Sequence, residues 1–260
     1  MKERLILYAG LYLIFWLFEM RFGAEKGHTL ENKLVNIFYG LVLFLTGVVI
    51  VGYIYAVIPY KPRQLVDRGI GGSILIVFLY LFLSDFIFYW YHRAQHKFKF
   101  LWAIHELHHS DTELNVTSSM RTYWLDRPVQ ALVITFPVSY IIGIDSTAIN
   151  IYLVVFTVWL FLTHANLRIR FGIFTRVFVG PQLHRIHHSS LPQHQDKNIA
   201  QFFPIIDILF GTYYHPAADE FPPTGLAEKN TDRSVLTAMV KPFSDWFNFL
   251  KGKKSVKTPK

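Results

Sequence analysis

The chain has 260 residues, of which 52% are hydrophobic and 17% aromatic, and its formal net charge at pH 7 is +8. Soluble domains carry more charged and fewer aromatic residues, so the composition indicates a membrane protein. The absence of cysteine excludes disulfides and cysteine-ligated iron–sulfur clusters in this chain. The basic residues border apolar stretches and match no nucleic-acid-binding motif, so no nucleic-acid partner is expected.

Five apolar stretches are candidate membrane segments, at residues 5–20, 37–59, 69–91, 129–143 and 148–162. The first three are predicted to be long enough to cross a bilayer. The last two are near the short limit and are predicted to form a tight helical hairpin that turns at residues 143–146. The first stretch resembles a secretory signal, but it is long and no small-residue cleavage site follows it, so we predict an uncleaved span.

The basic residues predict the orientation, since cytoplasmic loops carry an excess of Lys and Arg. The two short loops between the first three stretches lie on opposite sides of the membrane, and the basic residues of one nearly balance those of the other. The decisive residues lie around the last segments and in the C-terminal tail: Arg93, Lys97, Lys99, Arg121, Arg127, Lys251, Lys253, Lys254, Lys257 and Lys260. They predict a multi-pass integral membrane protein whose polar region faces the cytosol, in a bacterial inner membrane or the endoplasmic reticulum.

Nine of the twelve histidines fall into compact clusters. The pattern His-x-x-His-His occurs twice, and because positions i, i+3 and i+4 share a helix face, each copy is expected to direct three ring nitrogens towards one point. A pair four residues apart and a single histidine after an apolar run complete the predicted metal ligands: His92, His96, His105, His108, His109, His164, His184, His187 and His188. Nine imidazoles are too many for one ion and suit two metals with four or five ligands each.

These features predict an all-α fold, a polytopic membrane helical protein with about four to five membrane segments and a cytosolic, helical, His-rich metal domain. We expect N-terminal membrane helices over residues 1–68, the metal-bearing catalytic region over 69–216, and a C-terminal loop, amphipathic helix and basic tail over 217–260. The amphipathic helix is predicted at residues 234–250. Its apolar stripe is expected to pack on the metal domain, with the membrane surface as the alternative.

Asp85 is a carboxylate inside an apolar stretch, where it is costly without a partner. It shares a helical stripe with His92 and His96. We predict that it accepts a hydrogen bond from a metal-ligating imidazole and orients the ring. The alternative is a capping or buried hydrogen-bonding role that is unrelated to the metals.

Two other functional classes compete with a two-metal enzyme. His105, Glu106 and His109 satisfy the His-Glu-x-x-His signature of zinc hydrolases, but such an enzyme would leave most of the other histidines unexplained. A non-catalytic metal- or haem-binding electron-transfer protein would need only isolated axial pairs, and its Soret absorption would reveal it. A zinc hydrolase would retain activity without oxygen or a reductant.

The series of histidines resembles that of the fatty acid hydroxylase and sterol desaturase superfamily, a group of membrane di-iron enzymes. The resemblance runs from about residue 85 to residue 216 and includes Asp196, Asn198 and the sequence Asp207-x-x-Phe210-Gly211-Thr212. It implies that the nine histidines hold two iron ions. It also implies an oxidoreductase of lipid metabolism that uses O2 and two electrons to hydroxylate or desaturate a fatty acid, sterol or related lipid.

Within this resemblance, His108 and His187 are expected to be essential for turnover, with Asp196 and Asn198 supporting the ligands. Some members carry a second histidine four residues after the position of His164, where this chain has Arg168. Water, His194 or another donor would then complete one metal, and the lipid and the position attacked stay open.

The electrons must come from another protein. The sequence contains no Gly-x-Gly-x-x-Gly pattern after a strand, no cysteine and no fused haem-binding domain. A separate electron donor is therefore expected, such as a ferredoxin or a cytochrome with its reductase.

Overall fold

The computed structural model describes residues 2–57, 69–143, 146–226 and 235–252. Across these residues the chain is helical, and the only β-type pairing described is an isolated bridge between Ser189 and Thr224. The α-helices are α1 (Lys2–Phe22), α2 (Leu30–Thr46), α3 (Gly52–Val57), α4 (Gly69–Lys97), α5 (Lys99–His109), α6 (Asp126–Gln130), α7 (Phe136–Ile142), α8 (Ser146–His164), α9 (Pro181–His187), α10 (Pro204–Phe210) and α11 (Val235–Leu250). Short π-helical turns, η1 (Gly47–Val51) and η3 (Ala131–Thr135), join α2 to α3 and α6 to α7. Short 3-10 turns follow at η2 (Val116–Met120), η4 (Gly172–Arg176) and η5 (Pro192–His194).

Three helices in the described part of the chain are long and apolar enough to cross a membrane. They are Leu30–Ile54, Gly71–Lys97 and Thr147–His164. They correspond to the predicted stretches 37–59, 69–91 and 148–162, so the all-α membrane fold is confirmed. The stretch at 5–20, also predicted to cross, forms most of α1, which is not among these three candidate spans.

The predicted hairpin arm at 129–143 is helical but interrupted by the π-helical turn η3, and it is not among the three candidate spans. It ends at Gly143, whose φ of 72° a side chain would disfavour. The predicted turn at 143–146 includes residues 144–145, which lie outside the described residues.

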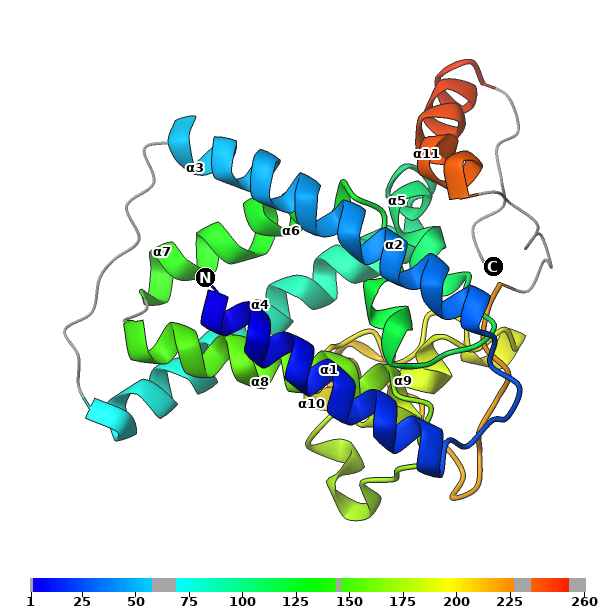
Figure 1. Cartoon of the computed structure of the whole chain (residues 1–260), viewed down its shortest axis with the longest axis horizontal. Helices are drawn as coiled ribbons and strands as arrows, with labels where there is room; N and C mark the ends of the chain where they lie inside the picture. The colour runs from blue at the N-terminus through cyan, green and yellow to red at the C-terminus, as the bar shows by residue number, and fades with distance from the viewer. Residues whose placement is uncertain (1, 58–68, 144–145, 227–234, 253–260) are drawn as a thin grey trace.

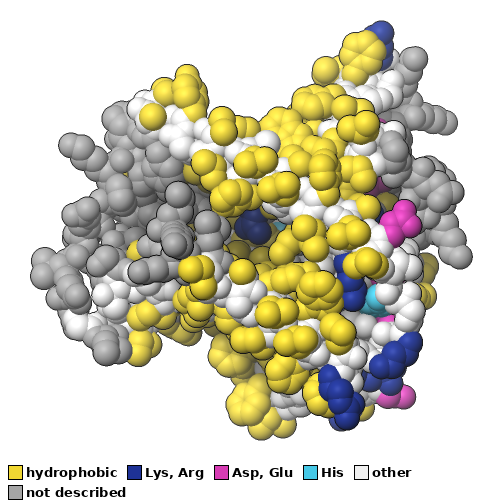
Figure 2. Space-filling model, viewed as in Figure 1, with side chains coloured by type: hydrophobic (Ala, Val, Ile, Leu, Met, Phe, Trp, Pro, Cys, Tyr) yellow, Lys and Arg dark blue, Asp and Glu magenta, His cyan; other side chains and the backbone are white. Residues whose placement is uncertain are grey.

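The long helices are apolar on their exposed surfaces as well as on the faces that pack inside the bundle. Leu17 on α1, Leu41 on α2 and Leu75 on α4 are 54%, 54% and 59% exposed. Figure 2 shows hydrophobic side chains over most of the described part of this face, with few charged side chains among them. Contiguous exposed apolar surface of this size is stable in a bilayer and not in water. The chain is an integral membrane protein.

Helix α4 is the centre of the bundle. One side of α4 packs with α8 and the segment before α10, in a core that includes Val77, Tyr89, Ala148 and Phe202. Its other side packs with η3 and α7 through Tyr80, Tyr91, Ile134 and Val138. The start of α2 and the last residues of α4 and α8 lie at the same end of the bundle (Figure 1). The short helices α5, α9 and α10 lie at this end, beside the spans.

Helix α11 packs on α5 less completely than its stripe suggested. Trp246 donates from its indole nitrogen to the carbonyl of Phe100 at 2.8 Å, and Lys241 pairs with Glu106. The prediction of a buried stripe is wrong for Phe243, Phe247 and Leu250, which are exposed, because α5 contacts the other side of the helix. The predicted start at residue 234 lies outside the described residues.

Candidate metal centre

The nine predicted histidines meet in two adjacent groups. In each group, one nitrogen of every ring lies within 4.8 Å of the others. Group 1 contains His92, His96, His105, His109 and His187, and group 2 contains His108, His164, His184 and His188. The groups touch, since the rings of His109 and His188 stack with their centroids 4.5 Å apart.

Each His-x-x-His-His motif divides its residues between the two groups. The i and i+4 residues of the first motif, His105 and His109, belong to group 1, whereas its i+3 residue, His108, belongs to group 2. The second motif reverses this, because His184 and His188 lie in group 2 and the i+3 residue lies in group 1. The expectation that each motif converges on one point was therefore wrong. Both motifs bridge the two groups and hold them side by side.

The spacing of the nitrogens fits shared metal ions. In group 1 the Nε2 atom of His92 lies 2.9 Å from that of His105 and 3.1 Å from that of His187. In group 2 the Nε2 atom of His164 lies 3.4 Å from that of His108 and 3.1 Å from that of His184. Two nitrogens about 2.1 Å from a common ion are about 3.0 Å apart at a right angle and about 3.4 Å apart at a tetrahedral angle.

Burial favours the neutral form of the rings, which is the form that binds a metal. Burial, with the neighbouring imidazoles as a second cause, lowers the pKa of His105, His109 and His188 well below its usual range. The same effects lower the pKa of His187 to about 3. In addition, the Nε2 atom of His96 is buried with no hydrogen-bond partner among the described residues. A metal ion would satisfy such nitrogens.

Backbone carbonyls fix the orientation of several rings. The Nδ1 atoms of His92 and His187 donate to the carbonyls of Ile199 and Lys197 at 2.8 and 3.0 Å. In group 2, the Nδ1 atoms of His108 and His164 donate to the carbonyls of Arg121 and Leu160 at 3.2 and 2.8 Å. A carbonyl can only accept, so Nδ1 carries the proton and the Nε2 lone pair faces the group.

The polar residues predicted to support the histidines make different contacts. Asp196 contacts one of the nine imidazoles directly, with its Oδ1 atom 3.3 Å from Nδ1 of His96. Asn198 hydrogen-bonds no imidazole in the described structure but accepts from the backbone N–H of Tyr214 at 2.9 Å. Both residues have positive φ, 57° and 53°, which Asp and Asn tolerate better than most residues. They flank Lys197 and thereby shape the turn whose carbonyl holds His187.

Asp85 does not orient an imidazole, so that prediction was wrong. Its carboxylate accepts the backbone N–H groups of three consecutive residues, Gln201, Phe202 and Phe203, at 2.7, 2.9 and 2.7 Å. Three donors from one loop are a strong match for a buried carboxylate, and they satisfy it without a ring. Asp85 thus ties α4 to the loop that approaches the histidines.

Asp207 also holds backbone N–H groups of this loop, at residues next to the histidines. It accepts the backbone N–H groups of Ile199 and Ala200 at 2.7 and 3.0 Å, and the hydroxyl of Thr212 at 2.6 Å. The carbonyl of Ile199 in turn holds His92. The sequence pointed to this position only through the family resemblance.

We predict that Asp207→Ala lowers metal affinity by about 10- to 100-fold, the usual effect of removing a group that supports a ligand. The variant leaves two buried N–H groups unsatisfied, at a cost of about 1–3 kcal/mol each, and it frees the Ile199 carbonyl to turn. Competitive chelator titration and thermal unfolding measure both effects. The exposed Asp219 provides the control, since Asp219→Ala should change neither quantity. Unchanged metal affinity in Asp207→Ala would contradict the supporting role.

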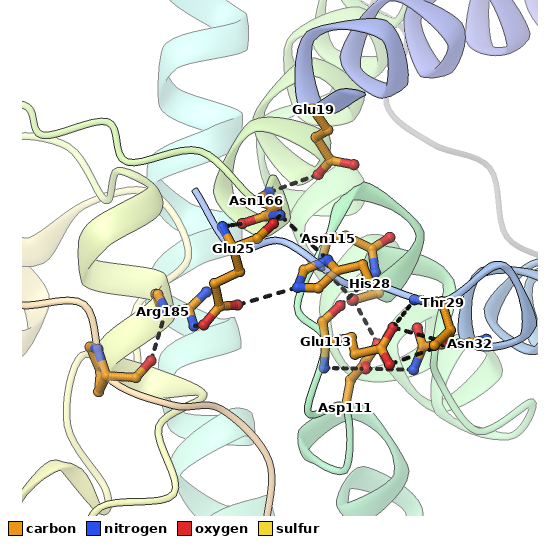
Figure 3. Close-up of polar contacts among 12 residues, drawn as sticks. Glu19, Glu25, His28, Thr29, Asn32, Asp111, Glu113, Asn115, Asn166 and Arg185 are labelled. Atoms are coloured by element: carbon orange, nitrogen blue, oxygen red, sulfur yellow. Dashed lines mark hydrogen bonds and ion pairs between the residues drawn. The ribbon is translucent and has the colours of Figure 1, made fainter. Parts of the chain in front are cut away.

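The N-terminal helices also brace the centre, a role that the sequence did not reveal. Glu19 on α1 accepts the backbone N–H groups of Val116 and Asn166, both at 2.7 Å, and Glu25 pairs with Arg185. Figure 3 shows Glu19 beside Asn166. Asn36 on α2 accepts from Arg121, whose carbonyl holds His108. The available signal was a polar residue inside an apolar stretch.

Two further residues lie outside both groups. His194 contacts Ser189 and Glu220 at 2.9 Å each, so it is not the additional ligand considered for one metal. Glu106, the glutamate of the zinc-hydrolase signature, pairs with Lys241 of α11. A carboxylate held in this way is not placed as a general base beside the histidines.

Two neighbouring cavities connect the histidines with the spans. The span cavity, of about 350 Å³, lies among α4, η3, α7 and α8 and includes Tyr80, Ile149 and Leu153 in its lining. The histidine cavity is smaller, about 60 Å³, and reaches His92 and His164. The two share a collar of five lining residues: Phe88, Arg127, Gln130, Phe156 and Gln201.

Comparison with known proteins identifies the family. The model of the fatty acid hydroxylase family matches residues 77–212, which contain all nine histidines. An ornithine lipid hydroxylase of Rhizobium tropici is 31% identical over 71% of this chain and 54% of its own length. The alkylglycerol monooxygenases of Caenorhabditis elegans and Homo sapiens are 30% and 28% identical over 60% and 64% of this chain, and 30% and 36% of their own lengths.

The chain therefore spans about half the length of the hydroxylase and about a third of the monooxygenases. No solved structure matches it significantly. The matched region begins in α4 and ends just after α10, so it includes both histidine motifs and the loop that Asp85 and Asp207 hold. On this match, the chain belongs to the fatty acid hydroxylase family.

Proposed function

We propose that the chain is a membrane-bound, non-haem di-iron monooxygenase that hydroxylates a lipid. The observation that carries the proposal is the position of the two histidine groups, beside a cavity that runs among the spans. Neutral imidazoles without cysteine suit iron, and nine of them suit two ions. The hydroxylase and monooxygenase names of the relatives agree with this chemistry.

In the proposal, group 1 and group 2 each hold one iron ion. Bound iron supplies the activation of O2: with two electrons and two protons, one oxygen atom enters a C–H bond and the other leaves as water. The chain's residues supply the geometry. Carbonyls and Asp196 hold the rings, and the Asp85 and Asp207 anchors hold the loop that carries these carbonyls.

The span cavity would hold the apolar part of the substrate. Its walls come from membrane helices, so a lipid can reach it from the bilayer without crossing water. Along α8 the cavities extend from Ile149 to His164, about 22 Å at 1.5 Å per residue. A substrate chain lying there would present one carbon to the histidine groups and exclude water from the collar.

The active site would face the cytosol, which the basic residues around the last segments favour. On that side a soluble or membrane-bound electron donor with its reductase can reach the centre. A ferredoxin or a cytochrome meets this requirement.

Metal analysis and a product assay on the purified protein test the proposal. We expect two iron atoms per chain, a coupled pair in the Mössbauer spectrum, and a hydroxylated lipid that contains one atom from labelled O2. Ornithine lipids and alkylglycerols are the first substrates to try, because relatives are named for them. A single zinc ion, or product formed without oxygen and reductant, would refute the proposal.

A further inference from the structure

Helix α11 has an apolar stripe that nothing in the described structure covers. Leu236, Val240, Phe243, Phe247 and Leu250 follow one another at intervals of four and three residues, which places them on one helix face. Their exposed fractions are 76%, 60%, 49%, 57% and 80%. An isolated exposed leucine needs no explanation, but five in one stripe mark an interaction surface.

The other side of α11 is fixed to the protein. The indole of Trp246 stacks on Phe100 with the ring centroids 4.8 Å apart and donates to its carbonyl. Lys241, on the same side, pairs with Glu106 and with Asp245. These contacts determine which face of the helix points outward, so the exposed stripe is not a result of rotation about a loose attachment.

The attachment point lies at the end of a membrane span. Phe100 stands three residues after the last residue of α4, and both Phe98 and Phe100 are themselves substantially exposed, at 56% and 47%. In Figure 1, α11 projects from the bundle beside α5, crosswise to α2. Exposed apolar residues at the end of the span α4 thus lie beside the attachment point of α11.

The charges after the stripe indicate its occupant. Residues 251–260 contain five lysines and no acidic residue, and the ammonium of Lys251 lies 4.1 Å from the ring centroid of Phe247. An apolar stripe followed by a basic segment is typical of helices that lie in the headgroup region of anionic membranes. A protein groove would satisfy the stripe but would not account for its place beside the exposed apolar end of a span.

We propose that α11 is an interfacial membrane helix. Its stripe enters the leaflet at the metal-centre end of the bundle, and Lys251, with the basic charge of the sequence after it, favours anionic lipid headgroups there. This assignment does not depend on the reaction that the metal centre performs. It adds a lipid-binding surface outside residues 77–212, the part of the chain that the family model matches.

The absence of cysteine makes a direct test possible, because a single introduced cysteine is the only labelling site. Phe247→Cys and Val240→Cys place an environment-sensitive fluorophore on the stripe. Asn248→Cys is the matched control, one residue further and about 100° around the helix. The full-length protein is labelled and reconstituted in phosphatidylcholine vesicles that contain phosphatidylglycerol and a lipid with a nitroxide on its acyl chain.

We expect the nitroxide to quench the labels at 240 and 247 at least about twofold more than the label at 248. Replacing the five lysines by glutamine, or omitting phosphatidylglycerol, should reduce this difference. Equal quenching at the three positions would overturn the proposal. Protection of the 247 label from aqueous iodide without quenching by the lipid nitroxide would also overturn it, since a protein would then cover the stripe. Unchanged metal content verifies that each variant is folded.

Discussion

Replacing His187 by alanine is expected to empty one metal site and to reduce turnover below detection. His187 belongs to group 1, where its Nε2 atom lies 3.1 Å from that of His92. Loss of a group that merely supports a ligand costs about 10- to 100-fold in metal affinity, so loss of the ligand itself should cost more than about 100-fold. Because group 2 keeps all four of its rings, we expect the metal content to fall from two ions per chain to about one.

His184→Ala is the counterpart in group 2, and it should leave the group 1 ion bound. His108→Ala should behave in the same way, since His108 is also a group 2 residue. His215→Ala is the matched control, because His215 is exposed and belongs to neither group. Elemental analysis, together with the yield of hydroxylated lipid, separates the outcomes. Two ions per chain or full activity in His187→Ala would contradict the assignment of that ring as a ligand.

The division of each motif between two groups follows from helix geometry, although the sequence analysis did not anticipate it. Residues i and i+4 differ by about 40° around a helix, whereas i+3 and i+4 differ by about 100°. One helical turn therefore presents its i and i+4 rings to one side and its i+3 ring to another. The identity of the nine rings was readable from the sequence because imidazoles rarely cluster for packing reasons. Which of the two groups each ring joins depends on the position of α5 relative to α9, and the sequence does not give that position.

The sequence also predicted the helical membrane fold, because long apolar stretches have few alternatives in a bilayer. It failed for Asp85, where the costly buried carboxylate was recognised but its partner was not. The donors are backbone groups of a loop more than one hundred residues away, and backbone groups carry no sequence signal. The same reason hid Glu19, which binds backbone N–H groups of Val116 and Asn166.

The span cavity predicts a test of where the substrate lies. Leu153→Trp adds a large ring to the cavity wall between Ile149 and the collar. If the lipid chain occupies this cavity, we expect kcat/KM for a long-chain lipid to fall by about 10- to 100-fold, or about 1.4–2.7 kcal/mol. Substrates whose chain is too short to reach from the histidine groups to Leu153 should be less affected. Metal content should not change, because Leu153 lies about two turns from Leu160, whose carbonyl holds His164.

Leu79→Trp provides the matched control for this substitution. Leu79 lies on α4 and is 46% exposed on the apolar surface, so the same added ring would face lipid instead of the cavity. Product yields measured over a series of chain lengths compare the two variants. A chain-length dependence confined to Leu153→Trp places the substrate among α4, α7 and α8. If both variants retain the parent's preference, the lipid reaches the histidine groups by another path, and the continuity of the two cavities is not the route of the substrate.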